Sequence, residues 1–485
     1  MNAPIRRMSV VVALLFTALL ISSTFIQVVQ AKSLQERPGN RRTLLANYAR
    51  ERGQILVDGR PVAKSTATKD ELKWLRTYPQ GELYAHVTGF YSFTYGAGGG
   101  IEGAEDSLLS GASDKLFYRR VSDILTGKDQ TGASLELTLN PKAQAAADKA
   151  LGNQRGAVVA LDPSTGEILA LVSHPTYDPS VLSSHNTTKV TTAWKKLNAD
   201  QARPMVDRAI AGNLYPPGST FKIVTSAAAL ESGKFTEESR IPGPATLKLP
   251  QTSTPLPNDD RQPCGPDGKT SLTHALEISC NTAFGWLGLQ LGAKDLVDQA
   301  SKFGIGDRLA IPMTVTPSTI PSNLDPPSLA QSAIGQRDVR VTPLQVAMIS
   351  AAVANRGVVM MPHLVKKVTS SELEVLDEPE PRELSHAVST DTATALTRMM
   401  QKVVESGTGT AAQIPGIDVA GKTGTAQHAV GQAPHAWFTG FAPAVDAKVA
   451  VAVVVEDGGN AGNEAVGGRV AAPIAKAVME AVLGR

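Results

Sequence analysis

The stretch Pro216-Pro217-Gly218-Ser219-Thr220-Phe221-Lys222 predicts a turn that leads directly into a helix. Two prolines and a glycine do not lie inside a helix, whereas the apolar periodicity from Ser219 to Leu230 is typical of one. We therefore expect Ser219 at the N-terminus of this helix and Lys222 one turn later, with both side chains on the same face.

Ser219 and Lys222 form a candidate pair of nucleophile and base. A lysine amine kept neutral by burial and a neighbouring cation can take the proton of a serine hydroxyl as its oxygen attacks a carbonyl. Backbone N–H groups at the helix N-terminus can stabilise the resulting oxyanion. A lone Ser-x-x-Lys is more often a serine N-cap followed by a surface lysine, so the pair needs support from elsewhere in the chain.

A second motif, Ser279-Cys280-Asn281, follows later in the chain. The hydroxyl of Ser279 can relay a proton between lysines and a leaving amine, and the N–H groups of the Asn281 amide can hold a substrate carbonyl. Each of these residues alone is more often an ordinary polar loop residue, so the motif gains meaning only beside the others.

A third motif, Lys422-Thr423-Gly424-Thr425, is predicted to lie in a strand. Thr423 and Thr425 then point the same way and can bind a substrate carboxylate, while Gly424 allows close approach. Strict alternation sends Lys422 to the opposite face, so a role for its charge requires local twist or an edge strand.

The segments around these motifs predict an antiparallel sheet covered by helices. Gly156 to Ser173 contains two apolar runs separated by a turn and is predicted to be a β-hairpin. Val449 to Val455 is predicted to be a buried strand, and Thr342 to Asn355 and Ala471 to Leu483 are predicted to be helices. Strands from both ends of this region, with helices between them, indicate an α+β fold. The Pro-rich stretch 241–270 is predicted to be a long irregular loop.

An apolar segment near the N-terminus predicts a membrane anchor. Arg6 and Arg7 precede an uncharged run from Met8 to Val29, which is long enough to span a bilayer. A cleaved signal peptide is the alternative, but no convincing small-residue cleavage site follows the run. The positive residues before the span place the chain beyond it on the outer side of the cytoplasmic membrane.

Composition narrows the choice of function. The 47 basic and 45 acidic residues give a formal charge of +2, so no global field favours nucleic acid as a partner. Only Cys264 and Cys280 are present, which excludes a disulfide scaffold and a four-cysteine zinc site. In an oxidising compartment they form either one disulfide, which would tie the irregular loop to the rim of the site, or two independent thiols.

Several other polar residues are assigned no catalytic or metal-binding role. Glu102 and Glu105 lie ahead of the motifs and are expected to make local contacts. The residues that lack metal-ligand spacing, and that we expect to be structural or exposed, are His174, His274, His428, His435 and Asp457.

In this order the three motifs resemble the set that penicillin-binding proteins share with class A β-lactamases, with Cys280 in the middle of the second motif. The likeness to class B penicillin-binding proteins extends through most of the chain after the apolar segment. The chain departs from that class after Arg52-Gly53, where the usual Asp-Arg pair is missing, which leaves open what the N-terminal part docks. Further segments similar to blocks of the class are Gly100-Ile101-Glu102-Gly103-Ala104-Glu105, Ile334-Gly335-Gln336, Val341-Thr342-Pro343-Leu344-Gln345, Gly407-Thr408-Gly409-Thr410 and Trp437-Phe438-Thr439-Gly440.

The resemblance implies an N-terminal membrane helix, an elongated β-rich pedestal, and a transpeptidase domain with a five-stranded antiparallel sheet covered by helices. The boundaries expected are 1–7 for a cytoplasmic tail, 8–30 for the transmembrane anchor, 31–145 for a non-catalytic, dimerisation-like pedestal, and 146–485 for the serine transpeptidase domain. No glycan-polymerising domain is apparent before Leu135, so strand synthesis is expected to need a partner enzyme.

The resemblance also implies a function in cell-wall synthesis and septation. Ser219 would form an acyl-enzyme with the D-Ala-D-Ala end of a peptidoglycan stem peptide and pass it to the amine of a neighbouring stem. β-Lactams would mimic the donor, no cofactor or metal is required, and partners would include a glycan-polymerising enzyme and other division or elongation proteins. The catalytic residues would be Ser219, Lys222, Ser279 and Lys422; the substrate-binding residues would be Asn281, Thr423, Gly424 and Thr425, with the backbone N–H groups of Ser219 and Thr425 forming the oxyanion hole.

Other functions are left open by the sequence. A serine β-lactamase would use the same acyl-enzyme with water as the acceptor, but it needs a general base that no motif identifies. A D,D-carboxypeptidase would hydrolyse the stem instead of cross-linking it. A non-catalytic protein that senses β-lactams or organises division is the alternative of another class.

Overall fold

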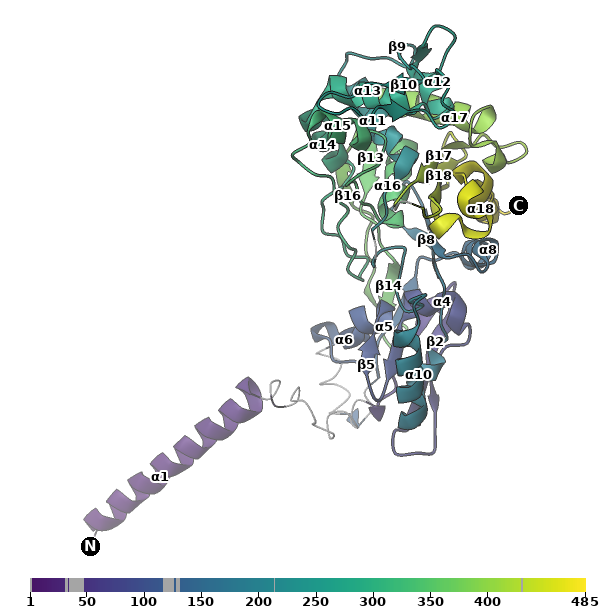
Figure 1. The fold of residues 1–485 in the computed structure, drawn as a ribbon. Coiled ribbons are helices and arrows are strands. Elements are labelled where there is room, and N and C mark those ends of the chain that lie inside the picture. Colours follow the sequence, from purple (N-terminus) through teal and green to yellow (C-terminus); the bar gives the residue numbers. More distant parts are fainter. Residues whose placement is uncertain are drawn as a thin grey trace.

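A computed structural model describes residues 2–30, 34, 48–116, 126–127, 131–212, 214–428 and 431–485. Helix α1 (Asn2–Thr24) continues as a π-helical turn (Phe25–Val29) and stands apart from the rest of the chain (Figure 1). Residues Pro4–Val29 have a mean hydropathy of 2.3 and bury none of their surface, and 26 residues of helix extend about 39 Å, enough to cross a bilayer. Among the described residues this is the one helix with the length and composition of a membrane span, as the sequence predicts.

The pedestal, in the lower lobe of Figure 1, is built on a six-stranded sheet of order β15-β14-β6-β1-β2-β3. Its strands are β1 (Ile55–Val57), β2 (Arg60–Ala67), β3 (Trp74–Thr77), β6 (Ser134–Leu137), β14 (Val365–Thr369) and β15 (Val375–Asp377). Strand β14 pairs antiparallel with β6, so two strands of this sheet come from far beyond residue 146. The single boundary at 145/146 therefore does not describe the spatial division, and most of residues 31–47 of the predicted pedestal lie outside the described part.

A buried ion-pair cluster holds the centre of the pedestal. The Nε atoms of Arg52 and Arg76 donate to the two carboxylate oxygens of Glu102, at 2.6 and 2.5 Å. Glu102 is fully buried, so its charge is balanced inside the protein by two guanidinium groups. Glu102, on the short helix α5 (Gly100–Ala104), thereby ties this helix to the sheet through Arg76, the third residue of β3.

The catalytic lobe contains the predicted five-stranded antiparallel sheet, in the order β17-β18-β19-β7-β8. The hairpin expected at 156–173 is present as β7 and β8, the two strands of this sheet that come first in the sequence. The buried strand expected at 449–455 is present with the same bounds. The strands are β7 (Gly156–Leu161), β8 (Ile168–His174), β17 (Ala420–Ala426), β18 (His435–Ala442) and β19 (Val449–Val455).

Helices cover both faces of this sheet. On one face α8 (Pro141–Leu151) and α18 (Gly467–Val482) pack against alternate residues such as Val158 and Phe438, and on the other α16 (Pro343–Ala354) packs against residues such as Val159. α16 is buried along its whole length because it lies between the sheet and a layer of further helices. These are α11 (Lys222–Glu231), α12 (Leu272–Glu277), α13 (Asn281–Leu291), α14 (Ala293–Lys302), α15 (Pro326–Ser332) and α17 (Thr390–Glu405).

The stretch 241–270, predicted to be irregular, is a loop that contains four short strands. β9 (Arg240–Pro242) pairs with β12 (Lys269–Ser271), and β10 (Thr246–Leu247) pairs with β11 (Leu256–Pro257). One strand pair therefore joins the two ends of the loop and the other joins two segments inside it. The loop packs against α13 beside the active-site motifs.

Candidate active site

Ser219 lies in a 3₁₀ turn, Gly218–Phe221, that runs directly into α11, close to the helix N-terminus that the sequence predicts. Gly218 has φ +54° and a Cβ there would lie 2.7 Å from the carbonyl oxygen of Thr425, so glycine is required at this turn. The indole of Trp437, which is fully buried, donates to the carbonyl of Pro216 at 3.1 Å. The Tyr215 hydroxyl donates to the buried carboxylate of Glu456 at 2.6 Å, so two contacts hold the segment that leads into the turn.

Lys222 is fully buried behind Ser219 and faces the second motif. Its Nζ donates to Asn281 Oδ1 at 2.7 Å, to the carbonyl of Ser279 at 2.8 Å and to Ser279 Oγ at 3.2 Å. Burial lowers the pKa of Lys222 to about 7, against the Asp259 carboxylate, which raises it. The amine is thus poised near neutral pH between a form that donates three hydrogen bonds and a form that can accept a proton.

Ser279 connects the two buried lysines. Its hydroxyl lies 3.2 Å from Lys222 Nζ and 3.0 Å from Lys422 Nζ. Its backbone has φ +63°, the left-handed region that non-glycine residues rarely occupy, and it sits directly before the disulfide-bonded Cys280 and helix α13. Strained backbone at this position aims a single hydroxyl at both amines.

Lys422 reaches the site because β17 is an edge strand of the sheet. Its Nζ donates to the carbonyl of Thr423, the next residue of its own strand, and to Ser279 Oγ. The side chain is fully buried, and its pKa lies well below the ordinary value, first because of burial and second because of the charge of Lys222. The sequence requires either local twist or an edge position for Lys422 to reach the site from the opposite face of its strand. β17 has the edge position.

The remaining residues of the third motif border the cleft in front of Ser219. A Cβ on Gly424 would come within 3.0 Å of both the Pro217 carbonyl oxygen and the Thr220 methyl group, so glycine permits the strand to lie against the serine turn. The cleft has a volume of about 380 Å³. The predicted site residues that line it are Ser219, Ser279, Cys264, Cys280, Thr423, Gly424 and Thr425.

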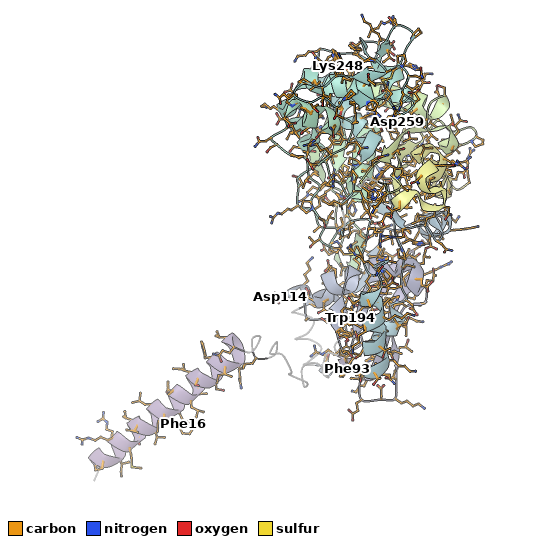
Figure 2. The ribbon with its side chains drawn as sticks, in the orientation of Figure 1. Phe16, Phe93, Asp114, Trp194, Lys248 and Asp259 are labelled. Atoms are coloured by element: carbon orange, nitrogen blue, oxygen red, sulfur yellow. A yellow bond between two sulfur atoms is a disulfide. The ribbon has the colours of Figure 1, made fainter. Side chains whose placement is uncertain are left out.

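The cleft is also lined by residues that the sequence did not single out as site residues, among them two aspartates and a threonine. Asp259 accepts a 2.9 Å hydrogen bond from Asn281 Nδ2, and Asp260 lies next to it in the loop. Thr408 lies 2.6 Å from the hydroxyl of Thr423, in a segment noted only for its resemblance. Figure 2 places Asp259 in the upper lobe, far from the pedestal residue Trp194 that it also labels. No local motif marks Asp259; it reaches the rim because Cys264 and Cys280 form a disulfide that anchors its loop.

The structure brings together three polar residues that have no metal-ligand spacing in the sequence. His428, His435 and Asp457 are expected from the sequence to be structural or exposed. In the structure the two histidine rings stack with centroids 4.0 Å apart, and His428 Nε2 lies 3.1 Å from Asp457 Oδ1. They come together because each stands at or just beyond the same end of a strand in one antiparallel sheet, which spacing along the chain does not reveal. His174 and His274 instead make separate pairs with Asp148 and Glu277.

Comparison with known proteins identifies the family to which this arrangement belongs. Residues 156–480 match the penicillin binding protein transpeptidase domain, and residues 52–135 match the penicillin binding protein A dimerisation domain. The chain belongs to the penicillin-binding protein transpeptidases. As a class B member, this penicillin-binding protein joins a non-catalytic N-terminal domain to the acyl-transfer domain.

The similarity of this penicillin-binding protein to its relatives spans the whole chain. It is 43% identical over 492 residues to the peptidoglycan D,D-transpeptidase PbpA of Mycolicibacterium smegmatis, covering 100% of this chain and 99% of the relative. A structure of penicillin-binding protein A from Mycobacterium tuberculosis as a ceftriaxone acyl-enzyme superposes with a TM-score of 0.87 at 43% identity, over 90% of this chain and all of the other. The penicillin G acyl-enzyme of that protein gives a TM-score of 0.85 at 42% identity with the same coverage.

Proposed function

We propose that this penicillin-binding protein is a peptidoglycan D,D-transpeptidase with Ser219 as its nucleophile. The observation that carries the proposal is the convergence of two buried lysine amines on one hydroxyl, that of Ser279, beside the cleft that Ser219 lines. Acyl transfer requires a serine whose proton can leave and return, and buried amines with lowered pKa values provide for both.

In the first half-reaction Ser219 Oγ attacks the carbonyl of the penultimate D-Ala of a donor stem. Lys222 in its neutral form accepts the serine proton as the C–O bond forms. The C–N bond then breaks, and a proton relayed through Ser279 from the lysine pair is given to the departing D-Ala amine. Within the part of the chain that the structure describes, no hydrogen bond joins Ser219 Oγ to Lys222 Nζ, so a small movement accompanies binding.

In the second half-reaction the amine of an acceptor stem attacks the ester carbonyl of the acyl-enzyme. Its proton passes to the same lysine pair, the new amide forms, and Ser219 Oγ leaves with a proton. Thr423 and Thr425 are suited to hold the donor carboxylate, Asn281 to hold a peptide carbonyl, and the backbone N–H groups of Ser219 and Thr425 to stabilise the oxyanion. A β-lactam enters the same first half-reaction, and its ester persists because no acceptor displaces it.

We further propose that the catalytic lobe lies outside the cytoplasmic membrane, where peptidoglycan is. Arg6 and Arg7, which lie in the N-terminal part of helix α1 before its apolar run, support this orientation. The fold contains no candidate glycan-polymerising domain among the described residues, which supports cooperation with a separate polymerase during wall growth and septation. The edge strand β3 of the pedestal sheet is the natural place to look for such a partner.

The test is covalent labelling of the detergent-solubilised full chain with a fluorescent penicillin, read by peptide mass spectrometry. The labelled peptide should contain Ser219, and Ser219→Ala should remove the label. Ser226→Ala is the matched control, because it deletes a hydroxyl of the same helix that has no hydrogen-bond partner. Rapid loss of the adduct would favour a β-lactamase, release of D-Ala from a stem peptide without cross-linking would favour a carboxypeptidase, and a folded wild type without adduct would contradict the proposal.

A further inference from the structure

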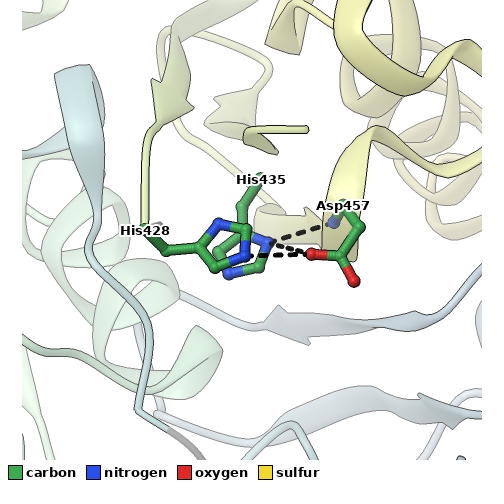
Figure 3. Close-up of side chains that lie close together, drawn as sticks. All are labelled: His428, His435 and Asp457. Carbon is green, nitrogen blue, oxygen red and sulfur yellow. Dashed lines mark hydrogen bonds and ion pairs between the residues drawn. The ribbon is translucent and has the colours of Figure 1, made fainter. Parts of the chain in front are cut away.

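Three adjacent strands of the catalytic sheet end in a cluster of potential metal ligands. His428 follows β17 by two residues, His435 is the first residue of β18, and Asp457 follows β19 by two residues (Figure 3). The mechanism uses none of these side chains. Tyr215 contacts the ring of His435 edge-on, with 5.4 Å between centroids, and so links the cluster to the turn that carries Ser219.

The donor atoms are already close to the spacing that a tetrahedral ion needs. His428 Nε2 and His435 Nδ1 lie 3.1 and 3.8 Å from Asp457 Oδ1, and all three donors lie within 4.8 Å of one another. Zn²⁺ binds imidazole nitrogen and carboxylate oxygen at about 2.0–2.1 Å, which puts ligands about 3.3 Å apart in a tetrahedron. Spacing is not the only requirement: the two rings are stacked with 7° between their planes, so one of them must turn before both nitrogens can face one ion.

One nitrogen atom of the cluster lacks a hydrogen bond. His428 Nδ1 is buried and has no hydrogen-bond partner among the described residues. Leaving a buried polar atom without a partner costs free energy. His435 Nδ1 accepts the backbone N–H of Asp457 at 3.1 Å and would exchange that bond for the ion. The His428 ring can therefore turn without losing a hydrogen bond at Nδ1, whereas His435 gives up one bond at its Nδ1.

The charges around the cluster also suit a cation. Asp457 offers Oδ1 to the two histidines, while its Oδ2 faces Arg155 at 4.0 Å, which orients the carboxylate. Arg155 is itself paired with Glu456 at 2.7 Å, so its charge is largely balanced. Asp457 is 48% exposed, which leaves a path from solvent and room for a fourth, water ligand.

We propose that His428, His435 and Asp457 form a binding site for a divalent transition metal ion, with Zn²⁺ as the ion that fits the donor set best. Two imidazoles, one carboxylate and a solvent position make up a common zinc ligand set. The ion would hold together the ends of three strands: β17, which carries Lys422 and Thr423, and its neighbours β18 and β19. Its role is to stabilise this end of the sheet; it takes no part in acyl transfer.

The experiment titrates Zn²⁺ into the untagged, chelator-treated full chain in detergent, by calorimetry and by metal analysis after gel filtration. Wild type should bind about one equivalent and unfold at a higher temperature when loaded. His428→Ala and Asp457→Asn should weaken binding by more than about 100-fold, since losing even the hydrogen-bond partner of a ligand costs about 10–100-fold. His386→Ala, which removes a 70% exposed histidine paired with Glu383, is the matched control and should bind like wild type.

A spectroscopic readout guards against variants that fail to fold. Co²⁺ in place of Zn²⁺ should give wild-type protein the intense visible absorption of a tetrahedral site, and Zn²⁺ should remove it. Ser219→Ala should give the same spectrum, which separates this proposal from the catalytic one. Absence of Zn²⁺ uptake by wild type, or uptake that survives both ligand substitutions, would overturn the site and leave the cluster as a structural histidine–aspartate contact.

Discussion

Asn281 Nδ2 donates a hydrogen bond of 2.9 Å to Asp259 Oδ1. The other end of the same amide, Oδ1, accepts from Lys222 Nζ at 2.7 Å, so the orientation of the amide is fixed from both sides. One N–H of the amide then remains to meet a substrate carbonyl in the cleft. Asp259 is therefore a positioning residue for Asn281, and its charge also raises the pKa values of Lys222 and Lys422 against the effect of burial.

Asp259→Asn should change both the rate and the pH dependence of penicillin acylation. Without the carboxylate the pKa of Lys222 falls below its value of about 7, so the rising limb of the rate moves to lower pH. The plateau should fall roughly tenfold because Asn281 is held less firmly. The measurement is the second-order acylation rate constant from about pH 5 to about pH 9. Asp260→Asn is the control, because this neighbour lines the cleft but accepts only from the backbone of Gln262; equal shifts in both variants would contradict the role of Asp259.

In the pedestal, Glu102→Gln should destabilise the protein by about 3–5 kcal/mol, because the buried Arg76 loses its carboxylate partner and Arg52 keeps only the half-exposed Asp106. Burial raises the pKa of Glu102, but the charges of Arg76 and Arg52 outweigh it, so the pKa of the folded state is lowered. The stabilisation is then present above the unfolded pKa of about 4.3 and is lost as pH falls through the folded value. Thermal unfolding followed down to about pH 3 should show the gap between wild type and variant narrowing.

Asp106→Asn provides the comparison for that cluster. Asp106 pairs with the same Arg52 at 2.7 Å but is 51% exposed, so its loss should cost less than about 1 kcal/mol. A Glu102→Gln variant as stable as Asp106→Asn would show that the buried cluster contributes nothing beyond a surface pair.

The parts of the fold that the sequence predicted are those with local signals. The hairpin at β7 and β8 follows from two apolar runs around a turn, and α16 follows from an unbroken apolar period. The pairing of β14 with β6 has no local signal, because two short strands far apart in the chain meet through tertiary packing. A domain boundary placed at one position in the sequence therefore leaves out β14 and β15, which belong to the pedestal sheet although they come later in the chain.

The candidate site divides in the same way. Ser219, Lys222, Ser279 and Lys422 were identified from motif order; hydrogen bonds join the last three, and Ser219 lines the same cleft as Ser279. Asp259 was missed because its position depends on the path of an irregular loop and on a disulfide, and the histidine pair because it depends on strand register. Contacts of this kind depend on how distant segments pack together, so no regular spacing in the sequence reveals them.

The disulfide itself should contribute measurably to stability. Closing a loop of this size in the unfolded chain is worth about 3 kcal/mol at 25 °C, in a model-dependent account. Cys264→Ala/Cys280→Ala should lower the free energy of unfolding by roughly that amount and should slow acylation, because Asp259 lies in the loop that the bridge anchors. Denaturant unfolding under oxidising conditions is the measurement, and an unchanged midpoint for the double variant would contradict it.

The pH dependence of wild-type acylation should report Lys222 directly. Burial lowers its pKa to about 7, and only the neutral amine accepts the serine proton, so the rate should rise with pH through a midpoint near that value. Lys222→Arg keeps the charge but does not deprotonate, so acylation should fall by roughly 10³-fold at every pH. Lys294→Arg, at a side chain 84% exposed, should leave the profile unchanged. A wild-type rate that stays flat through neutral pH, or a Lys222→Arg variant that still acylates quickly, would move the role of base to Lys422, whose pKa burial also lowers well below its ordinary value.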